Sequence, residues 1–380
     1  MHRLLALRDD VKIRVFFTWH GGGRLVEDRG FQRTFAWDIP LTDGYESEAV
    51  PNVARTPGTH HFFGLRNPEL IRRVMLWKPD VVHLTGYAYA SHMNALRACR
   101  RLGVPVLFRG DSHLLDTRRS DWRWVVKRTL LRTVFSWPSG FLTVGQANRA
   151  YYEAMGVPDS KLYPCPHSIE VARFAEPHAT LEKQALDWRK ELGIADDRIV
   201  VLFAGKFEDK KRPVALMQAV RQMADSRILL LMVGDGALAP DVRGLAAEDP
   251  QRFRVLPFQN QSRMPVVYRL GDLFVLPSAY GETWGLAVNE AMACSRPALV
   301  SDRVGSALDL LGDGACGAIF PADNWQAFAE ELHRMTAGPD QLKATGKRAL
   351  AVARQFDIAS TAEGVLNAVN AIRRQPGSSE

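Results

Sequence analysis

Short runs of aliphatic and β-branched residues alternate with segments of helical periodicity along most of the chain. In the first half, the predicted strands are residues 11–18, 80–84, 104–108, 140–144 and 162–164, and the predicted helices are 90–102, 119–137 and 148–155. Strands that alternate with helices are typical of a parallel sheet with helices on both faces. The first half is therefore predicted to form an α/β domain.

The alternation weakens between residues 170 and 182 and then restarts. The later predicted strands are 198–204, 228–233, 254–256, 273–276 and 298–301, and the helices are 185–192, 213–223, 242–247, 264–270, 286–293, 325–335, 341–355 and 358–372. We predict two Rossmann-like domains, 1–175 and 190–355, followed by a C-terminal helix and tail at 356–380. Such a pair encloses a cleft, and ligands bind at the carboxyl ends of parallel strands.

The composition is that of an ordinary globular protein. The 380 residues are 46% hydrophobic and 24% charged. No apolar run approaches the roughly 18–20 residues of a membrane span, and the first ten residues turn acidic too early for a signal peptide. The four cysteines are isolated, which excludes a zinc ribbon or a disulfide framework and favours a reducing cytoplasm.

The net charge of +7 comes from the first half. Residues 1–190 hold 28 lysines and arginines against 19 acidic residues, whereas the rest of the chain holds 21 against 23. Segment 118–132 mixes cations with Trp122, Trp124 and Leu130 at near-helical spacing, so it is a candidate for contact with an anionic membrane surface. The alternative is a solvated amphipathic helix packed on the sheet. Nucleic acid is not expected as a partner, because no binding motif or long basic run occurs.

Two loops after predicted strands of the second domain carry lysines and glycines. Gly205 is followed by Lys206 and Lys211, which could both reach one phosphate group near the start of the next helix. The alternative is a solvated basic loop. Gly234 and Gly236 form a tight turn that either leaves room for a ligand or is only a turn.

The strongest candidate chemistry follows the predicted strand 273–276. Glu282 lies in a loop and Glu290 lies eight residues on, a little over two helical turns away, so both carboxylates could line one ligand. A carboxylate accepts two hydrogen bonds at once, which suits vicinal sugar hydroxyls. The N–H groups at the start of this helix are expected to suit a diphosphate; they belong to Thr283, Trp284, Gly285 and Leu286. Alternatively, Glu290 only forms a salt bridge. The loop 258–261 could lie along the edge of a purine or pyrimidine ring. The alternative is a polar loop without a ligand.

The stretch GETWGLAVNEAMACSRPALVSDRVG resembles the E-x7-E signature of the family-4 (group 1) retaining glycosyltransferases, with Glu282 and Glu290 as its glutamates. GKFEDKKRP, MVGDG and FQNQSRMPVVYRLGDLFVLPS extend the resemblance over residues 198–335, and residues 80–174 match more loosely. The resemblance implies a GT-B fold, in which two Rossmann-like domains face a cleft and a C-terminal helix returns to the first domain. It implies transfer of a sugar from a UDP-sugar or GDP-sugar to a glycan, lipid-linked or small-molecule hydroxyl acceptor, in polysaccharide, lipopolysaccharide or glycolipid synthesis.

The resemblance also assigns roles to residues. Lys206 and Lys211 would hold the donor diphosphate, Glu290 the ribose hydroxyls and Glu282 the transferred sugar. No metal ion or other cofactor is expected, because the two cations and the helix dipole would stabilise the leaving diphosphate. The enzyme would be cytoplasmic, either free or peripheral on the inner face of the cell membrane.

Two points concern the first domain. His113, which follows the predicted strand 104–108, is our candidate for the family's active-site histidine, and His83 is a second candidate; a lone histidine at a strand end can also be structural. The family's first strand and glycine loop are expected to be missing, because residues 1–17 read as the end of the first helix and then the second strand. The glycine-rich run 19–24 is therefore not assigned to the diphosphate.

Other functions stay open at this point. A GT-B sugar-nucleotide epimerase would need further acids and bases in the first domain, and a phosphorylase would need a cofactor lysine and a longer chain. A degenerate nucleotide-sugar-binding protein would bind the donor without turnover.

Overall fold

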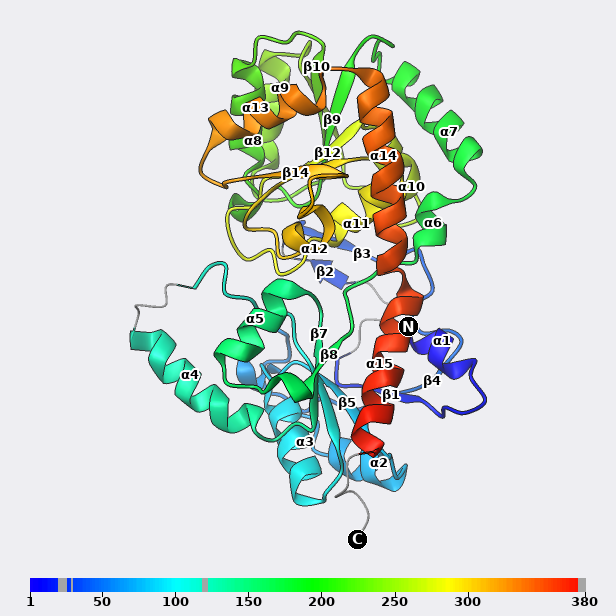
Figure 1. Cartoon of the computed structure of the whole chain (residues 1–380), viewed down its shortest axis with the longest axis vertical. Coiled ribbons are helices and arrows are strands. Elements are labelled where there is room, and N and C mark those ends of the chain that lie inside the picture. Colours follow the sequence, from blue (N-terminus) through cyan, green and yellow to red (C-terminus); the bar gives the residue numbers. More distant parts are fainter. Residues whose placement is uncertain (20–25, 29, 118–121, 375–380) are drawn as a thin grey trace. The chain divides into compact units, whose positions relative to one another are not determined.

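A computed structural model describes residues 1–19, 26–28, 30–117 and 122–374 (Figure 1). The chain divides into two α/β units. Unit 1 comprises Met1–Arg24, Pro40–His167 and Ile358–Glu380, and unit 2 comprises Leu25–Ile39 and Ser168–Asp357. The boundaries differ from the predicted ones in that residues 25–39 and 168–175 belong to unit 2.

Unit 1 is built on a four-stranded parallel sheet of order β5-β6-β7-β8. Its strands are β5 (Val82–Thr85), β6 (Val106–Arg109), β7 (Gly140–Thr143) and β8 (Leu162–Pro164). Helices α3 (Ala90–Arg101), α4 (Trp122–Phe135) and α5 (Gln146–Ala154) connect them in turn.

Alternate residues of these strands face two different cores. Phe108 and Phe141 pack with Phe135 of α4, whereas Leu107 and Leu142 pack with α15 (Ile358–Arg373). The chain's last helix therefore belongs to the first unit, which confirms the predicted return. A short helix α1 (His2–Ala6) precedes β1 (Arg14–Phe17), which pairs in parallel with β4 (Glu46–Ala49).

Unit 2 is a doubly wound six-stranded parallel sheet of order β11-β10-β9-β12-β13-β14. Its strands are β9 (Ile199–Ala204), β10 (Ile228–Val233), β11 (Phe253–Leu256), β12 (Leu273–Leu276), β13 (Ala298–Ser301) and β14 (Gly317–Phe320). Every residue of β10 and β12 is buried, because helices cover both faces. The strand order reverses between β9 and β12, which is where ligands bind in such sheets.

The helices of unit 2 largely follow the predicted pattern. They are α6 (Val171–Ala175), α7 (His178–Glu191), α8 (Pro213–Gln222), α9 (Ala239–Glu248), α10 (Met264–Arg269), α11 (Leu286–Ala293), α12 (Ala307–Leu311), α13 (Trp325–Met335) and α14 (Pro339–Ala353), with single turns η3 (Asp209–Lys211) and η4 (Arg354–Phe356). Strand β14 and helices α6 and α12 have no counterpart in the prediction, and α7 begins seven residues before the predicted helix 185–192.

The segment between β1 and β5 holds most of the unpredicted structure. An antiparallel hairpin of β2 (Val26–Asp28) and β3 (Arg33–Phe35) belongs to unit 2, and η1 (Phe62–Gly64) and α2 (Leu70–Leu76) belong to unit 1. The connection from β1 to β4 therefore carries a hairpin where a crossover helix is usual. Most of the glycine-rich run lies outside the described residues, and the absence of a first strand stays a prediction.

Two general expectations can be compared with this structure. All four cysteines are free and buried, and burial raises the pKa of the Cys99 and Cys316 thiols to about 11. Such thiols are inert at neutral pH. Among the described helices, none combines the length and the apolar character needed to cross a bilayer.

Candidate active site

The two predicted lysines both follow β9, and each contacts a carboxylate. The Lys206 Nζ lies 2.9 Å from Asp28 Oδ1, above the ring of Phe31 at 5.1 Å. The Lys211 Nζ donates to Glu282 Oε2 at 2.7 Å, and both of these side chains are largely buried. The structure therefore brings Lys211 and Glu282 together at the adjacent ends of β9 and β12.

The loop that carries Glu282 is held in one conformation. Glu282 forms a parallel bridge with Val304, and its carbonyl accepts from Gly305 N at 2.9 Å. A Cβ on Gly305 would lie 1.9 Å from the Thr283 carbonyl oxygen, so only glycine allows this approach. The Glu282 carboxylate also accepts from Ser278 Oγ at 3.0 Å. Its position is therefore set before any ligand arrives.

Gly285 and Trp284 fix the turn at the start of α11. Gly285 precedes the helix with φ of 87°, a left-handed conformation that glycine adopts without strain. Trp284 is 3% exposed, and its Nε1 donates to Asn289 Oδ1 at 2.8 Å. The Trp284 side chain therefore points into the protein and anchors the turn.

Glu290 lies on α11 in a partly buried position. The Tyr268 hydroxyl on α10 donates to Glu290 Oε2 at 2.5 Å. Burial raises the pKa of Glu290 to about 6, although the Tyr268 hydrogen bond and the charge of Arg173 act in the opposite direction. Neither Tyr268 nor Arg173 was predicted from the sequence as part of the site. A tyrosine after the apolar run MPVV was an available signal, because a buried hydroxyl needs a partner.

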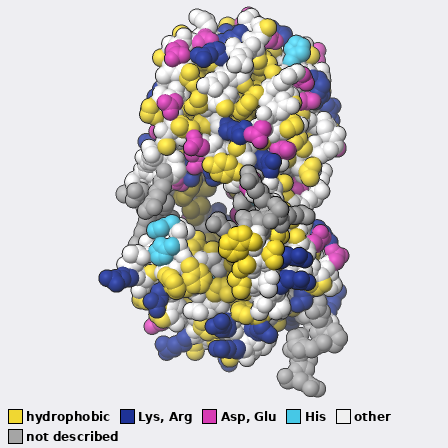
Figure 2. All heavy atoms as spheres, turned by 90° about the vertical axis from the view of Figure 1, so that its left-hand side faces the viewer, with side chains coloured by type: hydrophobic (Ala, Val, Ile, Leu, Met, Phe, Trp, Pro, Cys, Tyr) yellow, Lys and Arg dark blue, Asp and Glu magenta, His cyan; other side chains and the backbone are white. Residues whose placement is uncertain are grey.

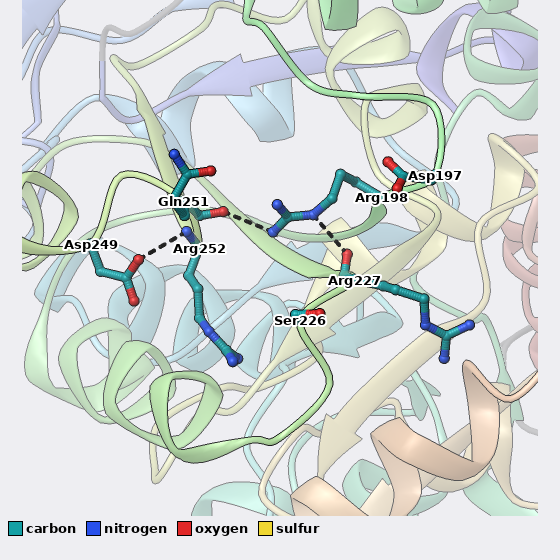
Figure 3. A pocket seen from close by; sticks show the side chains of 7 residues that line it. All are labelled: Asp197, Arg198, Ser226, Arg227, Asp249, Gln251 and Arg252. Carbon is teal, nitrogen blue, oxygen red and sulfur yellow. Dashed lines mark hydrogen bonds between the residues drawn. The ribbon is translucent and has the colours of Figure 1, made fainter.

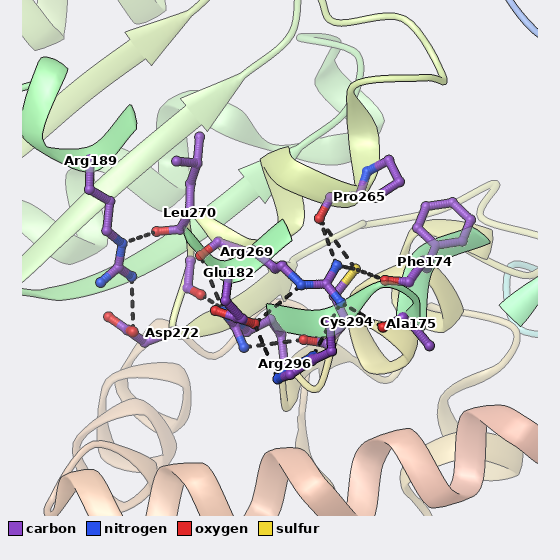
Figure 4. A network of polar contacts seen from close by, with 12 residues as sticks. Phe174, Ala175, Glu182, Arg189, Pro265, Arg269, Leu270, Asp272, Cys294 and Arg296 are labelled. Carbon is purple, nitrogen blue, oxygen red and sulfur yellow. Dashed lines mark hydrogen bonds and ion pairs between the residues drawn. The ribbon is translucent and has the colours of Figure 1, made fainter. Parts of the chain in front are cut away.

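A network of arginines and one glutamate fixes the helix that carries Tyr268 (Figure 4). Arg269 is fully buried and forms an ion pair with Glu182 at 3.2 Å. Glu182 also pairs with Arg296 at 2.8 Å, and Arg269 donates to the carbonyl of Pro265. Arg269 of α10 and Arg296 thus share the Glu182 carboxylate of α7, which connects α10 to α7.

The predicted glycine turn packs against the lysine loop. A Cβ on Gly234 would lie 1.9 Å from the Gly205 carbonyl oxygen, and one on Gly236 would lie 2.7 Å from that of Phe207. Both glycines therefore have a packing role, and ligand binding by them stays a prediction. The loop 258–261 is contacted by the hairpin β2–β3.

The candidate histidines lie in unit 1. The His113 ring is 5% exposed, and its Nδ1 accepts from Leu115 N at 3.1 Å. His83 lies on β5, where burial and then the charge of Arg109 lower its pKa to about 3. His83 is therefore neutral at physiological pH, which favours the structural alternative for it.

A polar pocket lies at the amino ends of the strands of unit 2, opposite to the ends that carry the lysines and glutamates (Figure 3). It is lined by residues that precede β9, β10 and β11: Asp197, Arg198, Ser226, Arg227, Asp249, Gln251 and Arg252. The Arg198 side chain donates to the carbonyls of Arg227 and Gln251. This pocket is remote from the strand ends that carry the lysines and glutamates. In the part of the chain that the structure describes, no group of three or more His, Cys, Asp or Glu side chains could hold a metal ion.

Comparisons with known proteins place the chain among the glycosyltransferases. Residues 184–352 match the family model "Glycosyl transferases group 1", and residues 40–166 match "Glycosyl transferase 4-like domain". The chain is 34% identical over 194 residues to a D-inositol 3-phosphate glycosyltransferase of Nocardia farcinica, covering 48% of this chain and 43% of the relative. It is 33% identical over 205 residues to the protein of that name from Streptomyces bingchenggensis, covering 49% and 44%. The chain thus spans less than half the length of these curated relatives.

Solved structures share the fold. A glycosyltransferase of Rickettsia africae superposes with a TM-score of 0.69 at 15% identity, covering 87% of this chain and 86% of that one. HepE of Anabaena, in complex with UDP, superposes with a TM-score of 0.68 at 16% identity, covering 86% and 87%. These neighbours establish the GT-B architecture. Because two glycosyltransferase family models match residues 40–166 and 184–352, the chain belongs to the group 1 glycosyltransferases.

Proposed function

We propose that the protein transfers a sugar, with retention of configuration and without a metal ion, from a nucleoside-diphosphate sugar to a hydroxyl acceptor. One observation carries the proposal. Lys206, Lys211, Glu282 and the start of α11 all lie at the carboxyl ends of β9 and β12, where the strand order of the sheet reverses. Two cations and a helix N-terminus at one such point suit a diphosphate.

The proposed roles follow from the chemistry of each group. Lys206, Lys211 and the N–H groups before α11 would stabilise charge that develops on the leaving diphosphate. Glu290 would accept hydrogen bonds from the ribose hydroxyls, and Glu282 would orient the sugar. His113 is the residue of unit 1 that we propose to contact the transferred sugar.

The proposed reaction needs no nucleophile from the protein. The bond between the anomeric carbon and the diphosphate oxygen breaks, and the acceptor oxygen bonds to that carbon on the same face. The acceptor proton passes to a leaving phosphate oxygen, which is a sufficient base when it is held close by. The products are the glycosylated acceptor and a nucleoside diphosphate.

A UDP-sugar is the donor that we propose to test first. The HepE structures contain UDP, UDP with glucose, and UDP-glucose, and that protein shares the fold of this chain. The names of the curated relatives point to a polyol phosphate as one acceptor to include. Glycans and lipid-linked sugars are the other proposed acceptors, as in polysaccharide, lipopolysaccharide or glycolipid synthesis.

Turnover of UDP-sugars and GDP-sugars with a membrane extract as the acceptor source tests the activity. We expect transfer of labelled sugar at a rate that EDTA leaves within about twofold, because lysines rather than a metal ion would stabilise the leaving group. The anomeric configuration of the product, read by NMR, tests retention. A rate that requires added Mg²⁺ or Mn²⁺ would refute the metal-free mechanism. Donor binding without transfer would favour the degenerate binder, and conversion of the donor without acceptor would favour an epimerase.

We also propose that α4 places unit 1 on an anionic membrane surface. Four apolar side chains of this helix, Trp122, Val125, Val126 and Leu130, are 49–69% exposed. The helix sequence WRWVVKRTLLRTVF has four cations and no acidic residue. Figure 2, which faces the side of the molecule that carries α4, shows hydrophobic side chains gathered on unit 1 with lysines and arginines around them. An apolar stripe flanked by cations suits the headgroup region of an anionic bilayer. A cytoplasmic protein peripheral on the inner membrane face would fit this surface.

Sedimentation with lipid vesicles tests this surface. The protein is expected to bind phosphatidylglycerol vesicles and not phosphatidylcholine vesicles. The double substitution Val126→Asp and Leu130→Asp is expected to lower the bound fraction about tenfold or more, since it removes apolar area and adds negative charge. Leu186→Asp on α7, where a leucine is 52% exposed, is the matched control and should leave binding unchanged. Equal loss in the control, or no binding by the unmodified protein, would refute the membrane role of α4.

A further inference from the structure

The hairpin β2–β3 places a carboxylate on the lysine proposed to hold the donor diphosphate. Asp28 Oδ1 and Oδ2 lie 2.9 and 3.0 Å from the Lys206 Nζ. Asp28 Oδ1 also accepts from the backbone N–H groups of Gly30 and Phe31, at 2.8 and 3.0 Å. Burial acts to raise the pKa of Asp28, but Lys206 and these N–H groups hold it below its usual value. The carboxylate is therefore charged at neutral pH, and it is bound as an anion.

Specific contacts also fix the rest of the hairpin, and the residues just after it, to the loop after β11 in the same unit. The ring centroids of Phe31 and Phe35 each lie 4.7 Å from that of Phe258. Asn260 Nδ2 donates to the Ala36 carbonyl at 2.7 Å, and Ser262 N donates to Asp38 Oδ1 at 3.1 Å. Aromatic pairs at this distance and two side-chain hydrogen bonds form a specific packing interface between residues 31–38 and loop 258–262. These contacts hold the Asp28 carboxylate at Lys206. They also place the hairpin against loop 258–261, which we propose to lie beside the nucleotide base.

A carboxylate and a diphosphate oxygen compete for the same ammonium. Their like charges repel at short range, so a diphosphate cannot approach Lys206 favourably while Asp28 stays in contact with it. When a ligand binds only one state of a protein, its apparent affinity is the intrinsic affinity multiplied by the fraction of molecules in that state. An ion pair that must open before binding therefore lowers the affinity for the donor.

We propose that Asp28 is an internal competitor of the donor diphosphate, which holds Lys206 in the free protein and releases it when the donor binds. The hairpin β2–β3 would thereby set donor affinity and move when the site fills. This inference rests on the proposed function, because it takes Lys206 as a diphosphate ligand.

Calorimetric titration with UDP at low salt tests the competition. Asp28→Asn keeps an oxygen that can accept from Gly30 N but removes the charge, and it is expected to tighten UDP binding about two- to tenfold. Asp38→Asn is the matched control, because it removes the same charge from the same segment at its contact with Ser262, away from Lys206. UDP affinity should change less than about twofold in the control.

A double-substitution cycle separates competition from a general effect of charge. In a Lys206→Ala background, Asp28→Asn should give no gain, because the gain acts through Lys206. Unchanged or weaker UDP binding by Asp28→Asn alone would overturn the proposal, and so would a gain that persists without Lys206. Failure of the proposed function gives a different result, in which the unmodified protein binds neither UDP nor GDP.

Discussion

Replacing Glu290 by alanine is expected to abolish detectable binding of the nucleotide-sugar donor. Tyr268 binds one oxygen of this carboxylate and fixes its orientation on α11, so the group is poised to accept hydrogen bonds from a ligand. A hydrogen bond to a charged group contributes about 1.5–3 kcal/mol, so losing two of them at the ribose weakens binding about a hundredfold or more. Titration with UDP measures this loss, and undiminished affinity would contradict the central assignment of the site.

Glu290→Gln is the variant that separates binding from folding. Burial raises the pKa of Glu290 from 4.5 to about 6, so between these values the folded protein binds more protons than the unfolded one. The stability that neutral Glu290 gives is complete below pH 4.5 and is lost as the pH rises through about 6. At pH 7.5 the glutamine variant is therefore expected to unfold at a higher urea concentration, with a gain on the order of 1–2 kcal/mol, and yet to lose donor affinity. A variant that is less stable at this pH would contradict the burial of a charged Glu290.

Donor affinity of the unmodified protein should depend on pH for the same reason. In the proposed role, the charged carboxylate would accept from both ribose hydroxyls, whereas the neutral acid would have lost part of this capacity. Affinity for UDP should therefore fall as the pH drops below about 6, and the glutamine variant should lack this dependence.

The strands that position the site were predictable because their residues are buried on both faces. The expected strands 228–233 and 273–276 coincide with β10 and β12, and 198–204 exceeds β9 by one residue. Continuous apolar runs of this length are typical of buried parallel strands. In contrast, β14 lies in the sequence GDGACGAIF, where glycines suggest a turn, and its place was not predicted.

The hairpin could not be predicted from local pattern. Its strands VED and RTF are short and mostly polar, and the ring on which Phe31 and Phe35 pack, Phe258, lies more than 200 residues away in the sequence. The pairing of Lys206 with Asp28 depends on that long-range contact. The pairing of Lys211 with Glu282 does not, because both follow strands that are neighbours in a doubly wound sheet. The sequence therefore predicted which elements form the proposed site, and not which internal carboxylate contacts Lys206.

Changing Lys206 and Lys211 together to alanine is expected to weaken UDP binding by roughly 3–6 kcal/mol, the sum of two charge-assisted hydrogen bonds. The structure adds a reason for a loss at the upper end of this range. Each lysine neutralises a carboxylate in the free protein, Asp28 for Lys206 and Glu282 for Lys211. Without Lys211, the Glu282 carboxylate would face the incoming diphosphate without a neutralising cation and would repel it.

Lys210→Ala is the matched control for this double variant. Lys210 lies in the same basic loop, but its ammonium is 3.3 Å from Glu208 and its side chain is about a third exposed. A general loss of positive charge would weaken UDP binding in the control as well, whereas specific contacts predict a change of less than about twofold. Circular dichroism of both variants establishes that they fold. A folded double variant that binds UDP as tightly as the unmodified protein would show that the diphosphate lies elsewhere.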